Sequence, residues 1–218
     1  FMLNLFYTGV AGVTAAAQGV DVTANNIANV NTAGYKAVKA NFSDLVYTNM
    51  RPGAGDIPQS GHGAKLASTD TVHVQGPARQ TGRPLDFALA EPDRYFAVLT
   101  AGGVRYTRSG NFHLSAEDGT MYLTAEDGAY VLDANGNLIE AASEDGELSP
   151  GVFSFRNEGG LVREGHTRFA ATDLSGGGEP AGAAVRRGWL EDSSVELTDE
   201  MASVIKLQKA FTMNAKMI

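Results

Sequence analysis

The sequence predicts a mainly β protein in which an irregular antiparallel β domain is inserted between N- and C-terminal helices that pair as a coiled coil. Two observations support this fold class. At both ends of the 218-residue chain, apolar residues recur at alternating intervals of three and four, the heptad period of helices that pack lengthwise. The middle of the chain lacks this period and contains short apolar runs separated by Asp-Gly and Asn-Gly turns, which are typical of antiparallel hairpins.

The first predicted helix covers residues 2 to about 30. Its glycines, Gly9, Gly12 and Gly19, each cost roughly 1 kcal/mol relative to alanine in a helix interior. Together with Ala16 they follow a 3,4,3 spacing, so they form a smooth stripe that a second helix can approach closely; a helix that frays in the isolated monomer is equally compatible with them. The heptad positions, which we expect to form an assembly interface, are Leu3, Phe6, Val10, Val13, Ala17, Val20, Ala24 and Ile27.

The second predicted helix begins after Ser193, which with Glu196 has the S-x-x-E spacing of a capping box. The run stops at Ile218 in mid-heptad without a capping glycine, so we expect the native chain to continue. Its heptad positions complete the expected assembly interface: Leu197, Met201, Val204, Gln208, Phe211, Ala215 and Ile218. Additional apolar residues lie off this stripe and indicate further partners, or packing on the central domain: Ile205, Leu207, Met213 and Met217.

The sequence predicts two domains. Residues 1–36 and 191–218 form a helical assembly domain, and residues 37–190 form a β-rich domain. Glycine- and proline-rich segments at about 51–64 and 175–182 are expected to be loops. Strand-like runs occur at 72–74, 85–89, 95–100, 104–107, 112–114, 121–124, 130–132, 152–155, 167–170 and 185–190.

Composition excludes several classes of function. The formal net charge of −8 disfavours nucleic acid as a partner, because nucleic-acid binding generally needs a basic surface. Without cysteine there is no disulfide, thiolate metal site or cysteine nucleophile. Polar residues interrupt the first helix, which argues against membrane insertion. The first basic residue is Lys36, so we expect any export to proceed without a cleaved secretory leader.

A calcium loop is the strongest metal motif and is nevertheless rejected. Asp133, Asn135, Asn137 and Glu144 have the 1, 3, 5, 12 spacing of such a loop, but the glycine expected at position six is Leu138. An Asn-Gly hairpin explains the same residues.

No other catalytic or cofactor site emerges. The histidines at positions 62, 73, 113 and 166 lack metal-ligand spacing, and we expect His73 and His113 to lie on strand surfaces. There is neither a nucleophile elbow nor a phosphate loop. We therefore predict that the protein is not an enzyme and holds no cofactor or metal.

Two basic–aromatic clusters, 105–108 and 186–189, admit two interpretations. Their arginines are either solvated strand residues or subunit contacts, since Arg, Tyr and Trp are favoured at interfaces.

The segment from 24 to 36 reads ANNIANVNTAGYK and closely resembles the N-terminal signature of the bacterial flagellar rod and hook family. The signature positions are Asn25, Asn26, Asn29, Asn31, Thr32, Gly34 and Tyr35. Residues 193–216 resemble the C-terminal helix of the same family, with Ser194 in place of its usual Asn. Residues 75–112, which include YTRSGNF at 106–112, resemble its rod proteins, best those of the FlgF and FlgG type.

The resemblance implies a structural axial subunit of the basal-body rod, the hollow drive shaft that transmits torque from motor to hook. It implies terminal helices that polymerise with copies of the chain and with other rod and hook subunits. It also implies delivery by the flagellar type III export apparatus to a position outside the cytoplasmic membrane.

Two alternatives remain at this point. The first is a hook or other hook–basal-body subunit. The second is a ligand-binding β module on a helical oligomerisation stalk, which requires a pocket lined by aromatic residues such as Tyr95, Phe96, Tyr106, Tyr122 and Tyr130. The position along the axis, and whether the terminal helices pair within one chain or only with neighbours, are left open.

Overall fold

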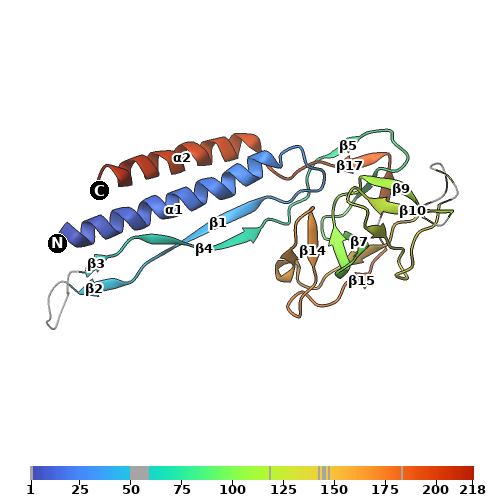
Figure 1. Ribbon diagram of the computed structural model, residues 1–218, viewed down its shortest axis with the longest axis horizontal. Coiled ribbons are helices and arrows are strands. Elements are labelled where there is room, and N and C mark those ends of the chain that lie inside the picture. Colours follow the sequence, from blue (N-terminus) through green and yellow to red (C-terminus); the bar gives the residue numbers. More distant parts are fainter. Residues whose placement is uncertain are drawn as a thin grey trace. The chain divides into compact units, whose positions relative to one another are not determined.

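The chain folds into two compact units in the computed structural model shown in Figure 1. The structure describes residues 2–49, 59–117, 119–141, 143, 146, 148–182 and 184–218, with the side chains of residues 2–4 excepted. Unit 1 comprises Phe1–Ala28, Val38–Val72 and Glu196–Ile218, and unit 2 comprises Asn29–Ala37 and His73–Val195.

This division differs from the boundaries expected from sequence, which placed all of 37–190 in the β-rich domain. The described part of Val38–Val72 belongs with the helices, because its two long strands pack along the first helix.

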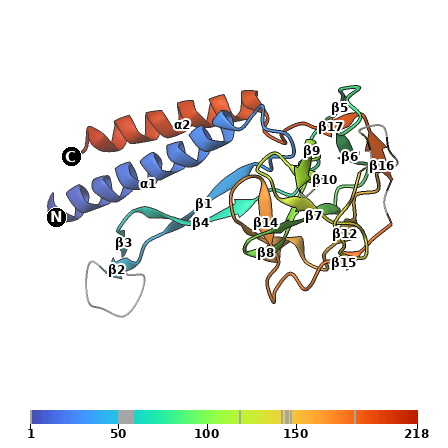
Figure 2. The same ribbon diagram turned by 45° about the vertical axis from the view of Figure 1, so that its right-hand side comes forward.

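Unit 1 is built from two antiparallel helices and a hairpin. The helices α1 (Met2–Ala28) and α2 (Leu197–Ala215) lie side by side, and the chain ends N and C mark the same end of the pair in Figures 1 and 2. The strands β1 (Val38–Asp44) and β4 (Ala64–Thr71) pair antiparallel beside α1, with a bulge between Asn41 and Phe42. The strands β2 (Tyr47–Asn49) and β3 (Gln59–Gly61) extend this hairpin. Part of the loop expected at 51–64 is therefore strand, and its residues 51–58 lie outside the described part.

The predicted capping box of α2 does not form. The residue before the helix is Glu196, and its side chain makes no capping hydrogen bond. The Ser193 hydroxyl instead accepts a hydrogen bond from the Val195 N–H at 3.3 Å, and the Ser194 hydroxyl accepts one from the Ala37 N–H at 2.9 Å. The serines therefore stabilise the chain that precedes the helix, and the residue that caps α2 is Glu196, three residues after the predicted cap at Ser193.

Unit 2 contains the main antiparallel sheet. Among the described residues this sheet has nine strands, in the order β13-β14-β8-β7-β11-β10-β9, with β12 pairing to both β7 and β15. The strands are β7 (Tyr95–Thr100), β8 (Gly103–Thr107), β9 (Phe112–Glu117), β10 (Thr120–Ala125), β11 (Tyr130–Val131), β12 (Val152–Ser154), β13 (Val162–Arg163), β14 (Arg168–Ala170) and β15 (Glu179–Pro180).

Smaller pairings complete unit 2. The strand β5 (Ala78–Gln80) pairs with β17 (Trp189–Glu191), and β6 (Phe87–Leu89) pairs with β16 (Val185–Arg187). The short helix η1 (Glu158–Gly160) precedes β13. These two pairings connect residues 78–89, near the start of the segment His73–Val195, with residues 185–191, near its end.

The core of unit 2 consists of two apolar clusters. One contains Phe87, Phe96 and Phe112, with Phe96 and Phe112 edge-to-face at 5.3 Å between ring centroids. The other contains Tyr95, Tyr106, Phe155 and Phe169 in similar edge-to-face contacts. Such pairs stabilise beyond their buried area by about 1 kcal/mol each.

The predicted fold class is confirmed: terminal helices flank an antiparallel β region. Most strand-like runs are strands, but 72–74 lies outside any strand. The hairpin β1–β4 was not predicted, because its residues are mainly polar and exposed and show no sustained apolar alternation.

Candidate assembly surface

The two helices pair within the chain through the smooth stripe of α1. A Cβ atom added to Gly12 would lie 2.5 Å from Asn214 Nδ2, and one added to Gly19 would lie 3.0 Å from Leu207 Cδ2. Gly9 similarly faces Ile218, at 3.0 Å from Cγ1. The small residues therefore let α2 approach closely, and Leu207, which lies off the heptad stripe, packs in this seam.

The heptad stripe of α1 is only partly covered within the chain. Phe6 and Val10 keep 43% and 39% of their surface exposed, and Ala24 is exposed as well. Val13, Ala17, Val20 and Ile27 are half-buried. The side chain of Leu3 lies outside the described residues.

The heptad stripe of α2 is also open. Leu197, Met201 and Phe211 are 44%, 55% and 40% exposed, and Gln208 and Ala215 are exposed too. Val204 is half-buried, and Ile218 is 52% exposed although it also faces Gly9. No residue of α2 is buried in the described chain. Both stripes are therefore available to other molecules.

Asn26 is the signature residue that holds unit 1 together. It is only 1% exposed. Its amide donates to the Val38 carbonyl at 2.7 Å and accepts from the Val38 N–H at 2.9 Å, as a neighbouring strand would. The same amide donates to Glu200 Oε1 at 2.7 Å. One side chain thus connects α1, β1 and α2.

The remaining signature residues shape the turn after α1. The Thr32 N–H and hydroxyl bond the Asn29 carbonyl and side-chain oxygen at 3.1 and 3.2 Å. Gly34 has a φ of +66°, and an added Cβ would lie 2.4 Å from the Ser109 nitrogen, so only glycine fits there. Asn25 and Asn31 are exposed.

Tyr35 connects this turn to the C-terminal signature. Its ring is 5% exposed and lies under the Arg163 guanidinium, 4.7 Å from the ring centroid. Its carbonyl accepts a hydrogen bond from the Ser194 N–H at 3.0 Å.

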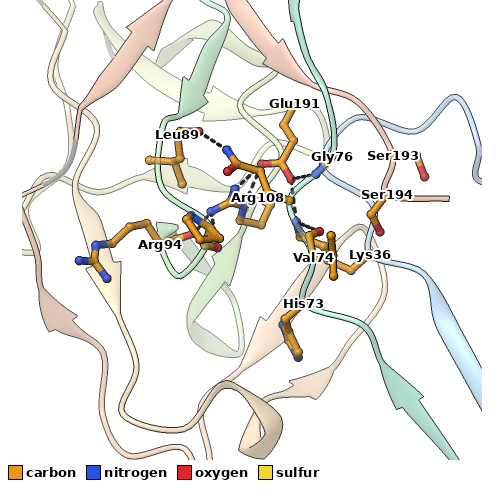
Figure 3. A network of polar contacts seen from close by, with 12 residues as sticks. Lys36, His73, Val74, Gly76, Leu89, Arg94, Arg108, Glu191, Ser193 and Ser194 are labelled. Atoms are coloured by element: carbon orange, nitrogen blue, oxygen red, sulfur yellow. Dashed lines mark hydrogen bonds and ion pairs between the residues drawn. The ribbon is translucent and has the colours of Figure 1, made fainter. Parts of the chain in front are cut away.

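A buried charge network lies beside these residues in unit 2 (Figure 3). Glu191 binds Lys36 Nζ at 2.6 Å and Arg108 Nη2 at 2.5 Å, and all three side chains are at most 2% exposed. The Gly76 N–H donates to the same carboxylate at 3.0 Å. Figure 3 shows the three chain segments that carry Lys36, Arg108 and Glu191 converging on this point.

Carbonyl oxygens accept the remaining hydrogen bonds of the two cations. Lys36 Nζ donates to the Val74 carbonyl at 2.7 Å, and Arg108 Nη1 donates to the carbonyls of Glu91, Pro92 and Arg94 at 2.6–2.8 Å. Burial lowers the pKa of Lys36, and the Glu191 carboxylate opposes that shift. Every side-chain nitrogen of the two cations thus has at least one hydrogen-bond partner, and such a network favours one arrangement of the segments that it joins.

The sequence interpretation of two side chains was wrong. Arg108 was expected to be solvated or at a subunit contact, but it is 1% exposed because Glu191 and three carbonyls bind it. His73 was expected on a strand surface, but its Nδ1 lies 2.8 Å from the Tyr95 hydroxyl and its ring packs against Phe169. The sequence did offer one signal for the network, since Lys36 and Arg108 lie within the segments that resemble the flagellar family. The error was to assume that the arginine side chain would be solvated.

Other site hypotheses find little support in the described residues. Tyr95, Phe96 and Tyr106 are in the core. In the described walls, a cavity of about 720 Å³ has no Phe, Tyr or Trp, and a cavity of about 400 Å³ has a single aromatic residue, Tyr130. The Asp133 carboxylate accepts the N–H groups of Asn135 and Asn137 at 2.8 Å, as expected for a hairpin turn. Across the described chain, no group of three or more metal-ligating side chains gathers, and neither described helix is long and apolar enough to span a membrane.

Comparison with known proteins connects this geometry to one family. A family model described as flagella basal body rod protein matches residues 6–36, and one described as flagellar basal body rod FlgEFG protein C-terminal matches residues 186–218. These matches contain Asn26, Tyr35, Lys36 and Glu191, so they include most of the residues that join the segments of each unit.

Curated relatives match over the whole chain. The flagellar basal-body rod protein FlgG of Bacillus subtilis is 33% identical, with 100% of this chain and 94% of the relative covered. The FlgG proteins of Borreliella burgdorferi and Caulobacter vibrioides are 32% and 31% identical, with 100% and 97% of this chain and 94% and 92% of the relatives covered. The chain belongs to the family of flagellar basal-body rod proteins.

Proposed function

We propose that this chain, a structural subunit of the flagellar basal-body rod, polymerises through the exposed heptad stripes of α1 and α2. The observation that carries the proposal is that the small residues of α1 already form the seam with α2, while Phe6, Met201 and Phe211 stay open. Burial of apolar surface contributes roughly 25 cal/mol per Å². Neighbouring copies that cover both stripes would therefore stabilise the polymer.

The proposed partners are copies of the chain and other rod and hook subunits, which together form the shaft that transmits torque from motor to hook. We expect the chain to reach this position through the flagellar type III export apparatus. Helices whose stability depends on packing suit that route, and no residue of α2 is fully buried in the described chain. The described chain offers no constellation for catalysis, and the role proposed is structural.

The test is the variant Phe211→Asp. A carboxylate on the α2 stripe would be buried in the polymer, so we expect the critical concentration for assembly to rise by at least about tenfold. Sedimentation and negative-stain microscopy measure the polymer, and circular dichroism checks that the fold is retained.

Lys206→Asp is the matched control, since Lys206 is an exposed α2 residue outside the heptad stripe. It makes the larger change in charge and is expected to leave assembly nearly unchanged. Normal assembly of Phe211→Asp would remove the α2 stripe from the interface.

A further inference from the structure

Three of the six methionines of the chain lie on α2 or just after it. Met201 and Met213 are 55% and 69% exposed, and Met217, two residues beyond the end of the helix, is 48% exposed. The chain contains no cysteine, so its thioethers are its only sulfur atoms. Exposed thioethers are common targets of mild oxidants, and α2 is therefore a region of the chain where oxidation is expected.

Met201 differs from the other methionines in its neighbours. Leu197, Met201 and Ile205 follow one another at intervals of four and are 44%, 55% and 52% exposed. Side chains at this spacing lie next to one another on one face of a helix. Val204, the next residue of the heptad stripe, is half-buried. Met201 thus stands at the centre of a continuous apolar surface, whereas Met213 lies off the heptad stripe.

A thioether suits this position, and a sulfoxide does not. Methionine is apolar and flexible, so it packs well against irregular partners. Its sulfoxide is polar, and the added oxygen accepts hydrogen bonds but donates none. Of the four α2 residues three or four positions from Met201, only Thr198 carries a side-chain donor, and the others are Leu197, Val204 and Ile205. Covering such an oxygen without a partner is unfavourable.

We propose that Met201 is a modification site, and that its oxidation to the sulfoxide blocks assembly of the chain. The oxidant in this proposal is hydrogen peroxide. The sulfur attacks one peroxide oxygen, an S–O bond forms as the O–O bond breaks, and the second oxygen leaves as water with both protons. The sulfur is oxidised by two electrons and the peroxide is reduced by two.

This inference rests on the proposed function, because the polarity of Met201 affects assembly only if a neighbouring copy covers the residue. It adds a chemical control to that function. The thioether is open to oxidation in the monomer, and a subunit with an oxidised Met201 cannot bury its α2 stripe without burying the sulfoxide.

The test compares assembly before and after oxidation. Monomer is treated with hydrogen peroxide, freed of the oxidant and then assembled, while peptide mass spectrometry measures the sulfoxide at each methionine. We expect the critical concentration of the native protein to rise by at least about fivefold. Met201→Leu keeps an apolar side chain of similar volume, so it should assemble equally well with and without the treatment. Methionine sulfoxide reductases should restore assembly of the oxidised native protein.

Met213→Leu is the matched control, because it removes an exposed α2 methionine outside the heptad stripe. It retains Met201 and should be as sensitive to peroxide as the native protein. Met201→Gln tests the same idea without an oxidant. It places a polar side chain of similar length on the stripe and should also raise the critical concentration.

The outcomes separate this inference from the proposed function, which Phe211→Asp tests independently. If Phe211→Asp fails to assemble but native protein with a fully oxidised Met201 assembles normally, the inference alone is overturned. Equal loss of assembly in oxidised native protein and oxidised Met201→Leu overturns it too, because another methionine is then responsible. Loss of the helical circular dichroism signal on oxidation also contradicts it, since the fold and not the interface is then affected.

The remaining combination contradicts the proposed function instead. If Phe211→Asp assembles normally while oxidation still blocks the native protein and spares Met201→Leu, control by Met201 is supported and the stripe around Phe211 is not part of the interface.

Discussion

At the residue scale, several residues of the terminal signatures act inside the chain rather than on its surface. Asn26 joins α1, β1 and α2 with one amide, and Lys36 shares a buried carboxylate with Arg108. The resemblance identified these positions, but the sequence could not show that they contact one another. Partners such as Lys36 and Glu191 are separated by 155 residues, and no local pattern encodes that pairing.

Glu191→Gln tests the charge network. The amide keeps the shape of the carboxylate but leaves Lys36 and Arg108 as buried cations without an anion. We expect the free energy of unfolding to fall by roughly 3 kcal/mol, as when a buried ion pair loses one partner. Urea denaturation measures this loss.

Asp192→Asn is the matched control for Glu191→Gln. Asp192 binds Arg79 at 3.1 Å, and both side chains are well exposed, at 36% and 60%. Loss of such a surface pair should change stability by less than about 1 kcal/mol. Equal effects of the two variants would show that the network contributes no more than a surface pair.

His73 makes the stability of the fold depend on pH. Burial, together with the positive charges of Lys36 and Arg163, holds the pKa of His73 below its usual value. As the pH falls below about 6.5, the unfolded chain binds a proton that the folded chain does not, so the free energy of unfolding decreases. The variant His73→Asn should lose this part of the acid sensitivity.

The His73 comparison is made by urea denaturation of both proteins between pH 7 and pH 5. Burial raises the pKa of Glu158, which acts in the opposite direction, but both proteins share that contribution. An identical pH dependence in the native protein and His73→Asn would contradict the assignment.

At the element scale, the existence of α1 and α2 was predictable but their contact face was not. The heptad stripe and the glycine stripe of α1 both follow intervals of three and four, so periodicity alone cannot say which one meets a helix of the same chain. The structure places Gly12 and Gly19 against α2 and leaves Phe6 and Val10 open. The hairpin β1–β4 escaped prediction because the packing of α1, rather than its own apolar pattern, accounts for it.

Gly19→Leu tests the helix seam. A Cβ there would lie 2.9 Å from Phe42 Cζ and 3.0 Å from Leu207 Cδ2. Leucine improves helix propensity, yet the overpacking should lower the free energy of unfolding by about 1–2 kcal/mol net. Thermal unfolding followed by the helical circular dichroism signal measures the change.

The control for the seam is Gln18→Leu, the neighbouring exposed position of α1. There the same side chain is expected to have an effect within about 0.5 kcal/mol. If Gly19→Leu proves as stable as Gln18→Leu, α2 does not pack closely on the glycine stripe in solution.

At the scale of the whole molecule, the helix pair joins two segments that lie far apart in the sequence. Unit 1 takes α1 from its first segment and α2 from its last, so the helix pair forms only when both segments are present. The segments of unit 2 are joined by the Lys36–Glu191 contact and by the β5–β17 pairing, neither of which involves α1 or α2. Because these contacts leave much of the heptad stripes exposed, the stripes are the surface through which we propose that subunits join the rod.

Hydroxyl-radical footprinting of the monomer and the polymer tests that central claim most directly. Met201 lies on the α2 stripe and is 55% exposed, and Met121 on β10 of unit 2 is 39% exposed. Oxidation of an accessible methionine reports its exposure. We expect Met201 to become protected on assembly while Met121 remains reactive. Unchanged oxidation of Met201 in the polymer would contradict assembly through the helix stripes.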